Sequence, residues 1–86
     1  MMHEYSSEIP FGKRLNNVLK YKSMKQRQLA NICGFDESHL SKMIKGQCMP
    51  SIRALAHISD VLDVKADYLL GLTSAKIENA FREKVR

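Results

Sequence analysis

Apolar residues recur at helical spacing along almost the whole chain, and this periodicity constrains the fold more than any other feature. The first group has i, i+4, i+7 and i+8 spacing and so shares one helix face: Phe11, Leu15, Val18 and Leu19. Pro10 suits the first turn of this helix, because the N–H that proline lacks would have no partner there anyway. We expect the helix to begin near Pro10 and to end near Lys22.

Glycines divide the rest of the periodic sequence into further helices. The second helix is expected to end at Gly34, the third at Gly46 and the fifth at Gly71, because glycine readily adopts the left-handed conformation that ends many helices. The apolar positions of the second and third helices are Leu29, Ala30, Ile32, Cys33, Leu40, Met43 and Ile44. Residues 9–72 are therefore predicted to form one compact, all-α, five-helix domain behind a flexible tail, 1–8.

Polar residues mark the other helix boundaries. The carboxylate of Asp36 is expected to accept from the first amides of the third helix, and Ser51 is expected to cap the fourth. The fourth helix should stop near Asp63, a residue type that tolerates the left-handed conformation. A short fifth helix follows from Ala66 to Leu70.

The C-terminal segment, 73–86, is predicted to form a short amphipathic helix outside the compact core. Ser74 can cap it, and one side carries Ile77, Ala80, Phe81 and Val85. An isolated helix of this length is marginal in water, so it must pack on its own domain, pack on another molecule, or fray. Ile77 and Phe81 are the natural residues for a homodimer contact or for docking on a protein partner.

Positive charge is concentrated in the first half of the chain. The net charge is +5, but Phe11 to Arg53 contains nine basic and two acidic residues, whereas 54–86 is neutral. Such a distribution favours a polyanionic partner such as nucleic acid, although a solvated basic face would look the same. Charge alone does not decide between these readings.

The spacing from Gln26 to Lys45 is more specific. Ala30 lets two helices cross closely, Gly34 supplies the positive φ of a sharp turn, and Leu40 with Met43 anchors the third helix by its inner face. The outer face then carries polar side chains that can bond to base edges or phosphates: Glu37, Ser38, Ser41, Lys42 and Lys45. This pattern predicts a helix-turn-helix.

The order and spacing of four stretches resemble the phage-repressor-like helix-turn-helix family, often called the Xre or Cro type. The stretches are FGKRLNNVL (11–19), QRQLANICGF (26–35), DESHLSKMIKGQCMPS (36–51) and IRALAHISDVLDVKADYLLGL (52–72). The resemblance implies a five-helix domain whose third helix, 37–45, lies in the major groove of double-stranded DNA. It also implies a sequence-specific transcriptional regulator, expected to be a repressor, that acts as a homodimer on paired half-sites.

The resemblance also assigns roles to residues. The positions that match base-reading residues are Gln26, Glu37, Ser38 and Lys42. Those that match contacts to the DNA backbone are Lys45, Gln47 and the amides at Ile52 and Arg53. Lys25 replaces the usual hydroxyl cap, and its charge is better placed for a phosphate. Ser41 and His39 are further candidates, and His39 either touches DNA or packs sideways.

One departure from the family pattern concerns the packing of the first helix on the third. The family often has Arg at the position of Leu19 and Glu at that of Ile44, and these form an ion pair. Here both residues are apolar. A packed apolar pair can replace a buried ion pair without loss of stability, so we expect Leu19 to contact Ile44.

Other classes of function have little support. No catalytic pair, glycine-rich phosphate loop or metal-ligand spacing is present, so we expect no enzyme, metal or cofactor. Cys33 and Cys48 are expected to be free thiols. No stretch is apolar enough to span a membrane, and we expect a cytoplasmic location. The remaining alternative is an antitoxin or co-regulator that acts through protein–protein contacts, which the same fold would permit.

Overall fold

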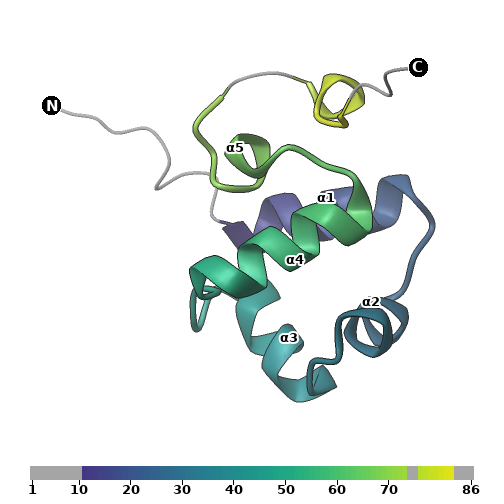
Figure 1. Ribbon diagram of the computed structural model, residues 1–86, viewed down its shortest axis with the longest axis vertical. Helices are drawn as coiled ribbons and strands as arrows, with labels where there is room; N and C mark the ends of the chain where they lie inside the picture. The colour runs from purple at the N-terminus through teal and green to yellow at the C-terminus, as the bar shows by residue number, and fades with distance from the viewer. Residues whose placement is uncertain (1–10, 74–75, 83–86) are drawn as a thin grey trace, which may run out of the picture.

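The computed structural model describes residues 11–73 and 76–82, and over these residues the predicted all-α, five-helix domain is confirmed. The helices are α1 (Phe11–Tyr21), α2 (Gln26–Cys33), α3 (Glu37–Ile44), α4 (Ile52–Leu62) and α5 (Ala66–Leu69), followed by a 3-10 helix, Ile77–Asn79. Helices α2 and α3 form one end of the molecule, and α5 with the 3-10 helix forms the other (Figure 1). The predicted tail, 1–8, lies outside the described residues, as do Ser74 and Val85.

The core is built mostly from the apolar positions that helical spacing selects; the expectation is wrong for Ile32, which is 56% exposed. All four residues of the first predicted face are buried in α1, with Leu15, Val18 and Leu19 fully enclosed. The other large side chains that are fully enclosed are Leu29, Leu40, Met43, Ile58, Leu62, Val64 and Leu69. They come from every α-helix and from the turn before α5, so one core holds the whole domain together.

Most of the predicted helix ends are confirmed. Gly34, Gly46 and Gly71 have φ of 76°, 82° and 77°, and Asp63 adopts the same left-handed conformation with φ of 58°. The hydroxyl of Ser51 accepts a hydrogen bond from the Ala54 amide at 3.1 Å, as expected of an N-cap. Each of these ends thus has the residue that its backbone needs, either one that adopts the left-handed conformation or one whose hydroxyl caps the helix.

The expected cap of the third helix is wrong. Asp36 precedes α3 with extended backbone, but its side chain makes no capping hydrogen bond. Its carboxylate instead accepts from the hydroxyl of Ser38 at 2.9 Å. A hydroxyl two residues away competes with the backbone amides for the carboxylate and occupies it here.

The predicted amphipathic C-terminal helix is also wrong over the described residues 76–82. A 3-10 helix of three residues replaces it, and Phe81 forms an antiparallel bridge with Val64. The Lys65 amide donates to the Ala80 carbonyl at 2.8 Å, and the Arg82 amide donates to the Asp63 carbonyl at 2.9 Å. The turn between α4 and α5 offers backbone groups that need partners, and the segment satisfies them by folding back on its own domain.

Two further contacts hold this segment in place. The ring of Phe81 stacks on Tyr21 at the end of α1, with the ring centroids 5.2 Å apart. The guanidinium of Arg82 pairs with the Asp60 carboxylate of α4 at 2.8 Å. Ile77 is half-buried against the core, and Ala80 is buried. The segment therefore belongs to the domain and does not stand outside it.

Helix α1 contacts both α3 and α5 closely. Gly12 lies against the end of α3, where a β-carbon added to it would meet the backbone carbonyls of Met43 and Ile44. Near the same end of α1, the Arg14 guanidinium is buried, donates to the Tyr68 carbonyl of α5 at 3.1 Å, and lies 4.6 Å from the centre of the Tyr68 ring. Leu19 is buried and Ile44 is half-buried against the same core; their direct contact stays a prediction.

Candidate nucleic-acid interface

A sharp turn joins α2 to α3 and fixes the angle between them. Gly34 ends α2 in the left-handed conformation, and its amide donates to the Asn31 carbonyl at 3.3 Å. The Phe35 amide reaches back to the Ala30 carbonyl at 2.9 Å. Two bonds of this kind satisfy carbonyls at the end of α2 and stop the helix abruptly. The chain can then enter α3 after only a few residues.

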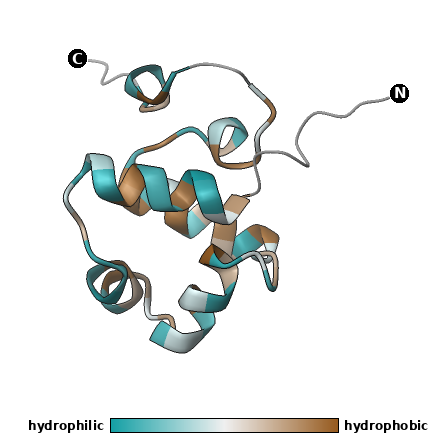
Figure 2. Cartoon of the chain, turned by 180° about the vertical axis from the view of Figure 1, so that it is seen from behind, coloured by the Kyte–Doolittle hydropathy of each residue, from teal (hydrophilic) through white to brown (hydrophobic). Residues whose placement is uncertain are grey.

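Helix α3 has one buried face and one open face. Leu40 and Met43 are fully enclosed, so the helix is anchored along its inner side. The side chains of Glu37, Ser38 and Lys42 are exposed, as the helical spacing predicts, and Ser41 is half-exposed. Hydrophilic residues of α2 and α3 lie at the end of the molecule that is far from α5 (Figure 2). This arrangement leaves a polar helix face available to a partner.

The beginning of α2 lies beside the beginning of α3. Lys25 precedes α2 and is exposed, while Gln26, the first residue of the helix, is half-buried. The Lys25 side chain makes no cap; instead its amide donates to the side-chain oxygen of Gln28 at 2.8 Å. Arg27 reaches across to α3, where its Nε lies 3.7 Å from the Glu37 carboxylate. The structure thus brings together the two helix starts that carry Gln26 and Glu37.

The hydroxyl of Ser38 has its proton committed to the Asp36 carboxylate. A serine oxygen that donates in this way still has lone pairs, so it can accept from a base amino group without breaking the bond to Asp36. It could donate to a base only by giving that bond up. In this state Glu37 and Ser38 are therefore both hydrogen-bond acceptors, whereas Lys42 is a donor.

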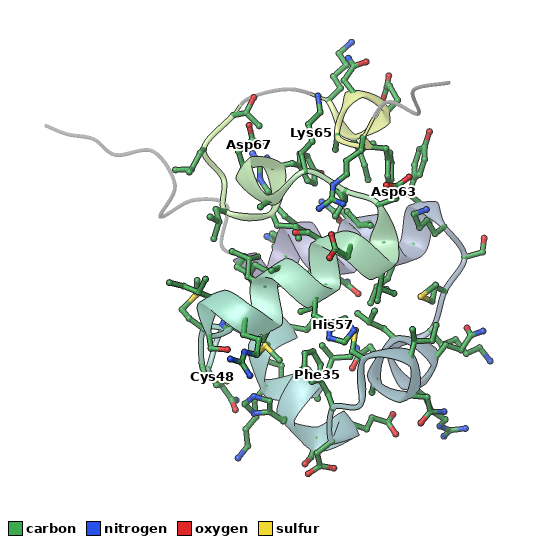
Figure 3. The ribbon with its side chains drawn as sticks, viewed as in Figure 1. Phe35, Cys48, His57, Asp63, Lys65 and Asp67 are labelled. Carbon is green, nitrogen blue, oxygen red and sulfur yellow. The ribbon has the colours of Figure 1, made fainter. Side chains whose placement is uncertain are left out.

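Phe35, in the turn, sits between two histidines. The ring of His39 lies edge-on to it at 6.5 Å, and the ring of His57 in α4 lies at the same separation. Figure 3 shows Phe35 and His57 next to each other between α3 and α4. The sideways packing considered for His39 is present, while the residue remains exposed. Its contact with DNA stays a prediction.

The loop after α3 and the start of α4 carry the residues that are expected to contact the DNA backbone. Lys45, Gln47, Ile52 and Arg53 are all exposed, and the Ile52 side chain keeps 88% of its surface. The first amides of a helix have no partner within the helix and favour an anion. The Ser51 hydroxyl accepts from the Ala54 amide, and the contact of the Ile52 and Arg53 amides with a phosphate stays a prediction.

Acidic side chains gather away from α3. Asp63 and Asp67 lie at the opposite end of the molecule from Phe35 and His57, together with Lys65 (Figure 3). Asp60 of α4 is paired there with Arg82. Lys25, Arg27, Lys42 and Lys45 lie on or beside α2 and α3, where Asp36 and Glu37 are the only acidic residues. A positive field at this end would attract a polyanion.

Among residues 11–73 and 76–82, no three side chains form a group that could hold a metal ion, and no helix has an apolar stretch that would span a bilayer. Cys33 and Cys48 are free thiols, as predicted, and burial raises the pKa of the Cys33 thiol above its usual value.

A helix-turn-helix whose second helix is anchored inside and polar outside is an arrangement that binds the major groove of DNA. The chain belongs to the Cro/C1-type helix-turn-helix DNA-binding domain family, whose sequence model matches residues 14–74. This membership confirms the predicted family.

Two known proteins are similar to the chain. The SPbeta prophage-derived uncharacterized HTH-type transcriptional regulator YonR of Bacillus subtilis (strain 168) is 29% identical over 68 residues, which are 79% of this chain and 63% of that protein. The crystal structure of the restriction-modification controller protein C.AhdI from Aeromonas hydrophila is similar with a TM-score of 0.67 and 28% identity, over 76% of this chain and 98% of that one.

Sequence reasoning missed two residues that shape this surface. Arg27 was only one of several basic residues along the chain, and its pairing with Glu37 depends on how α2 crosses α3. Gly12 carried a signal that could have been used, because a glycine inside a helix is unfavourable unless a neighbour needs the space. That neighbour is the backbone at the end of α3.

Proposed function

We propose that the protein is a sequence-specific, double-stranded DNA-binding transcriptional regulator, and that it acts as a repressor by occupying its operator. The observation that carries this proposal is the exposed polar face of α3, on a helix that Leu40 and Met43 anchor in the core. Membership of the Cro/C1-type family supports it. The names of the two similar proteins, a transcriptional regulator and a controller protein, point the same way.

In this proposal α3 enters the major groove. Gln26, Glu37, Ser38 and Lys42 read bases, with His39 and Ser41 as further contacts. Lys25, Lys45, Gln47, Arg53 and the amide of Ile52 bind the DNA backbone, where they contribute affinity without sequence information. A cytoplasmic location is part of this proposal, because a protein that regulates transcription must have access to the DNA.

We further propose that two copies bind paired half-sites, because one recognition helix reads too few base pairs to select a site within a genome. Ile77 and Phe81 remain the proposed contact, at the surface where Phe81 stacks on the exposed Tyr21 ring. Truncation after Thr73 should then weaken both dimerisation and operator binding. If both stayed unchanged, the dimer role of the segment would be wrong.

Enrichment of random DNA on the purified protein tests the main proposal. A palindromic motif is the expected result, and a pool without any enriched sequence would contradict it. Should the protein instead bind no DNA but co-purify with a second chain, the alternative of an antitoxin or co-regulator would be favoured.

A pair of lysine variants then tests the assignment of roles on α3. Lys42→Ala should reduce binding to the operator by about 1–3 kcal/mol and relax the preference at one base position, with less effect on random DNA. Lys45→Ala should weaken all sequences about equally and lower the dependence on salt. Equal losses on operator and random DNA for Lys42→Ala would make Lys42 another phosphate contact.

A further inference from the structure

Arg27 lies in the first turn of α2, yet its side chain reaches the first residue of α3. Its Nε is 3.7 Å from Oε1 of Glu37, and the two side chains keep 77% and 51% of their surface. An ion pair this open to water adds little to folding stability, because solvent screens it and both side chains lose freedom to form it. Any larger effect must come from where the pair holds the Glu37 carboxylate.

We infer that Arg27 is a positioning residue for base reading, which holds the Glu37 carboxylate in place for the N4 amino group of cytosine. The inference rests on the proposed function, in which the open face of α3 lies in the major groove. An ionised carboxylate can only accept hydrogen bonds, and among the groups of the major groove the N4 amino group of cytosine is its matching donor.

The charge of Glu37 explains why it needs a partner. Asp36 and Glu37 are the only acidic residues between Phe11 and Arg53, and Glu37 is exposed on the face that would approach two rows of phosphates. A lone carboxylate there is repelled by the DNA. Arg27 sets a positive charge beside it, and a guanidinium has five N–H donors, so other donors remain for a phosphate.

The pairing also limits how freely Glu37 moves before DNA arrives. The two residues stand on separate helices, each fixed by buried side chains such as Leu29 and Leu40. A carboxylate already held near its bound position loses less freedom on binding, which favours the matching base. Without Arg27, Glu37 would retain its chemistry but lose this preference in orientation.

The test uses the full chain and the DNA motif enriched from a random pool. Comparing the motifs of wild type and Glu37→Gln identifies the base that Glu37 reads, which should be cytosine. The measured quantity is the ratio of Kd values for that DNA and for DNA with this one base pair replaced. Arg27→Ala should reduce the ratio about fivefold or more, since a well-made base contact discriminates by at least that factor.

Three control variants separate positioning from simple charge. Arg27→Lys keeps the positive charge and should restore part of the ratio. Lys65→Ala removes one exposed positive charge at the far end of the molecule and should leave the ratio unchanged (Figure 3). In the Glu37→Gln background, Arg27→Ala should no longer change the ratio, because the carboxylate that it positions is gone.

Each failure has its own signature. If Arg27→Ala weakened both DNAs equally at an unchanged ratio, Arg27 would be a phosphate contact and the inference would be overturned. An unaltered motif for Glu37→Gln would overturn it as well, while leaving the proposed function intact. If the wild-type protein enriched no sequence at all, the proposed function itself would fail.

Discussion

Replacing Gly12 by alanine tests how tightly α1 is packed on the end of α3. A β-carbon at this position would lie 2.5 Å from the Met43 carbonyl oxygen and 2.6 Å from the Ile44 carbonyl carbon. Both are backbone atoms, which cannot rotate away as a flexible side chain can. One helix must therefore shift relative to the other.

The expected magnitude is set by two opposing effects. Overpacking by a single carbon destabilises a well-packed core by about 1–3 kcal/mol, and sometimes by more when backbone must move. Alanine is favoured over glycine inside a helix by about 1 kcal/mol, which offsets part of this loss. Because the obstructing atoms are backbone, we expect an overpacking cost at the top of this range, about 3 kcal/mol, and therefore a net loss of stability of about 2 kcal/mol.

Thermal unfolding followed by circular dichroism measures this loss. For a domain of this size, about 2 kcal/mol lowers Tm by about 8–16 °C. Asn17→Ala is the matched control, since Asn17 is exposed on the same helix and its replacement should change stability by only about 0.5 kcal/mol. A Gly12→Ala protein with the Tm of wild type, or a higher one, would refute the close approach of α1 to α3.

Further predictions concern the core, the C-terminal segment and the thiols. Leu19→Arg alone should lower the free energy of unfolding, measured by urea titration, by about 3–5 kcal/mol, because it buries an unpaired charge. Adding Ile44→Glu should recover much of this loss. If it recovered none, the two side chains would not be in contact. Phe81→Ala should destabilise by about 2 kcal/mol, because a half-buried ring loses its stack on α1; unchanged urea unfolding would speak against that contact. Iodoacetamide should modify Cys48 before Cys33. Burial raises the pKa of the Cys33 thiol, so at a given pH less of it is the reactive thiolate. Modification of Cys33 first, measured by peptide mass, would contradict this.

Features that depend on the local chain could be predicted from the sequence. The left-handed conformations at Gly34 and Asp63 follow from residue type and position, and so does the cap at Ser51. The open face of α3 follows from the period of Leu40 and Met43 alone, since two inward residues fix the direction of the others. The candidate surface was accessible to sequence reasoning for this reason.

Features that depend on competition between partners could not be predicted in the same way. Asp36 had two possible partners, and the Ser38 hydroxyl took the place of the backbone amides. The segment around Ile77 and Phe81 has helical spacing, but the Lys65 amide and the Asp63 carbonyl, on either side of Val64, form a different set of hydrogen bonds with it. In both cases the local sequence preference, for a helix cap at Asp36 and for a helix around Ile77, was real, but hydrogen bonds to other residues were made instead.

The contact between Arg14 and α5 also bears on the order in which a newly made chain can fold. The guanidinium of α1 finds its carbonyl acceptor 54 residues further along the chain. Synthesis proceeds from the N-terminus, so α2 and α3 leave the ribosome before α5 does. Until α5 follows, Arg14 lacks the carbonyl to which it donates, and the part of α1 that packs on α5 is uncovered. The helices proposed to face DNA are thus made early, but the domain that holds them is complete only after Tyr68 has left the ribosome.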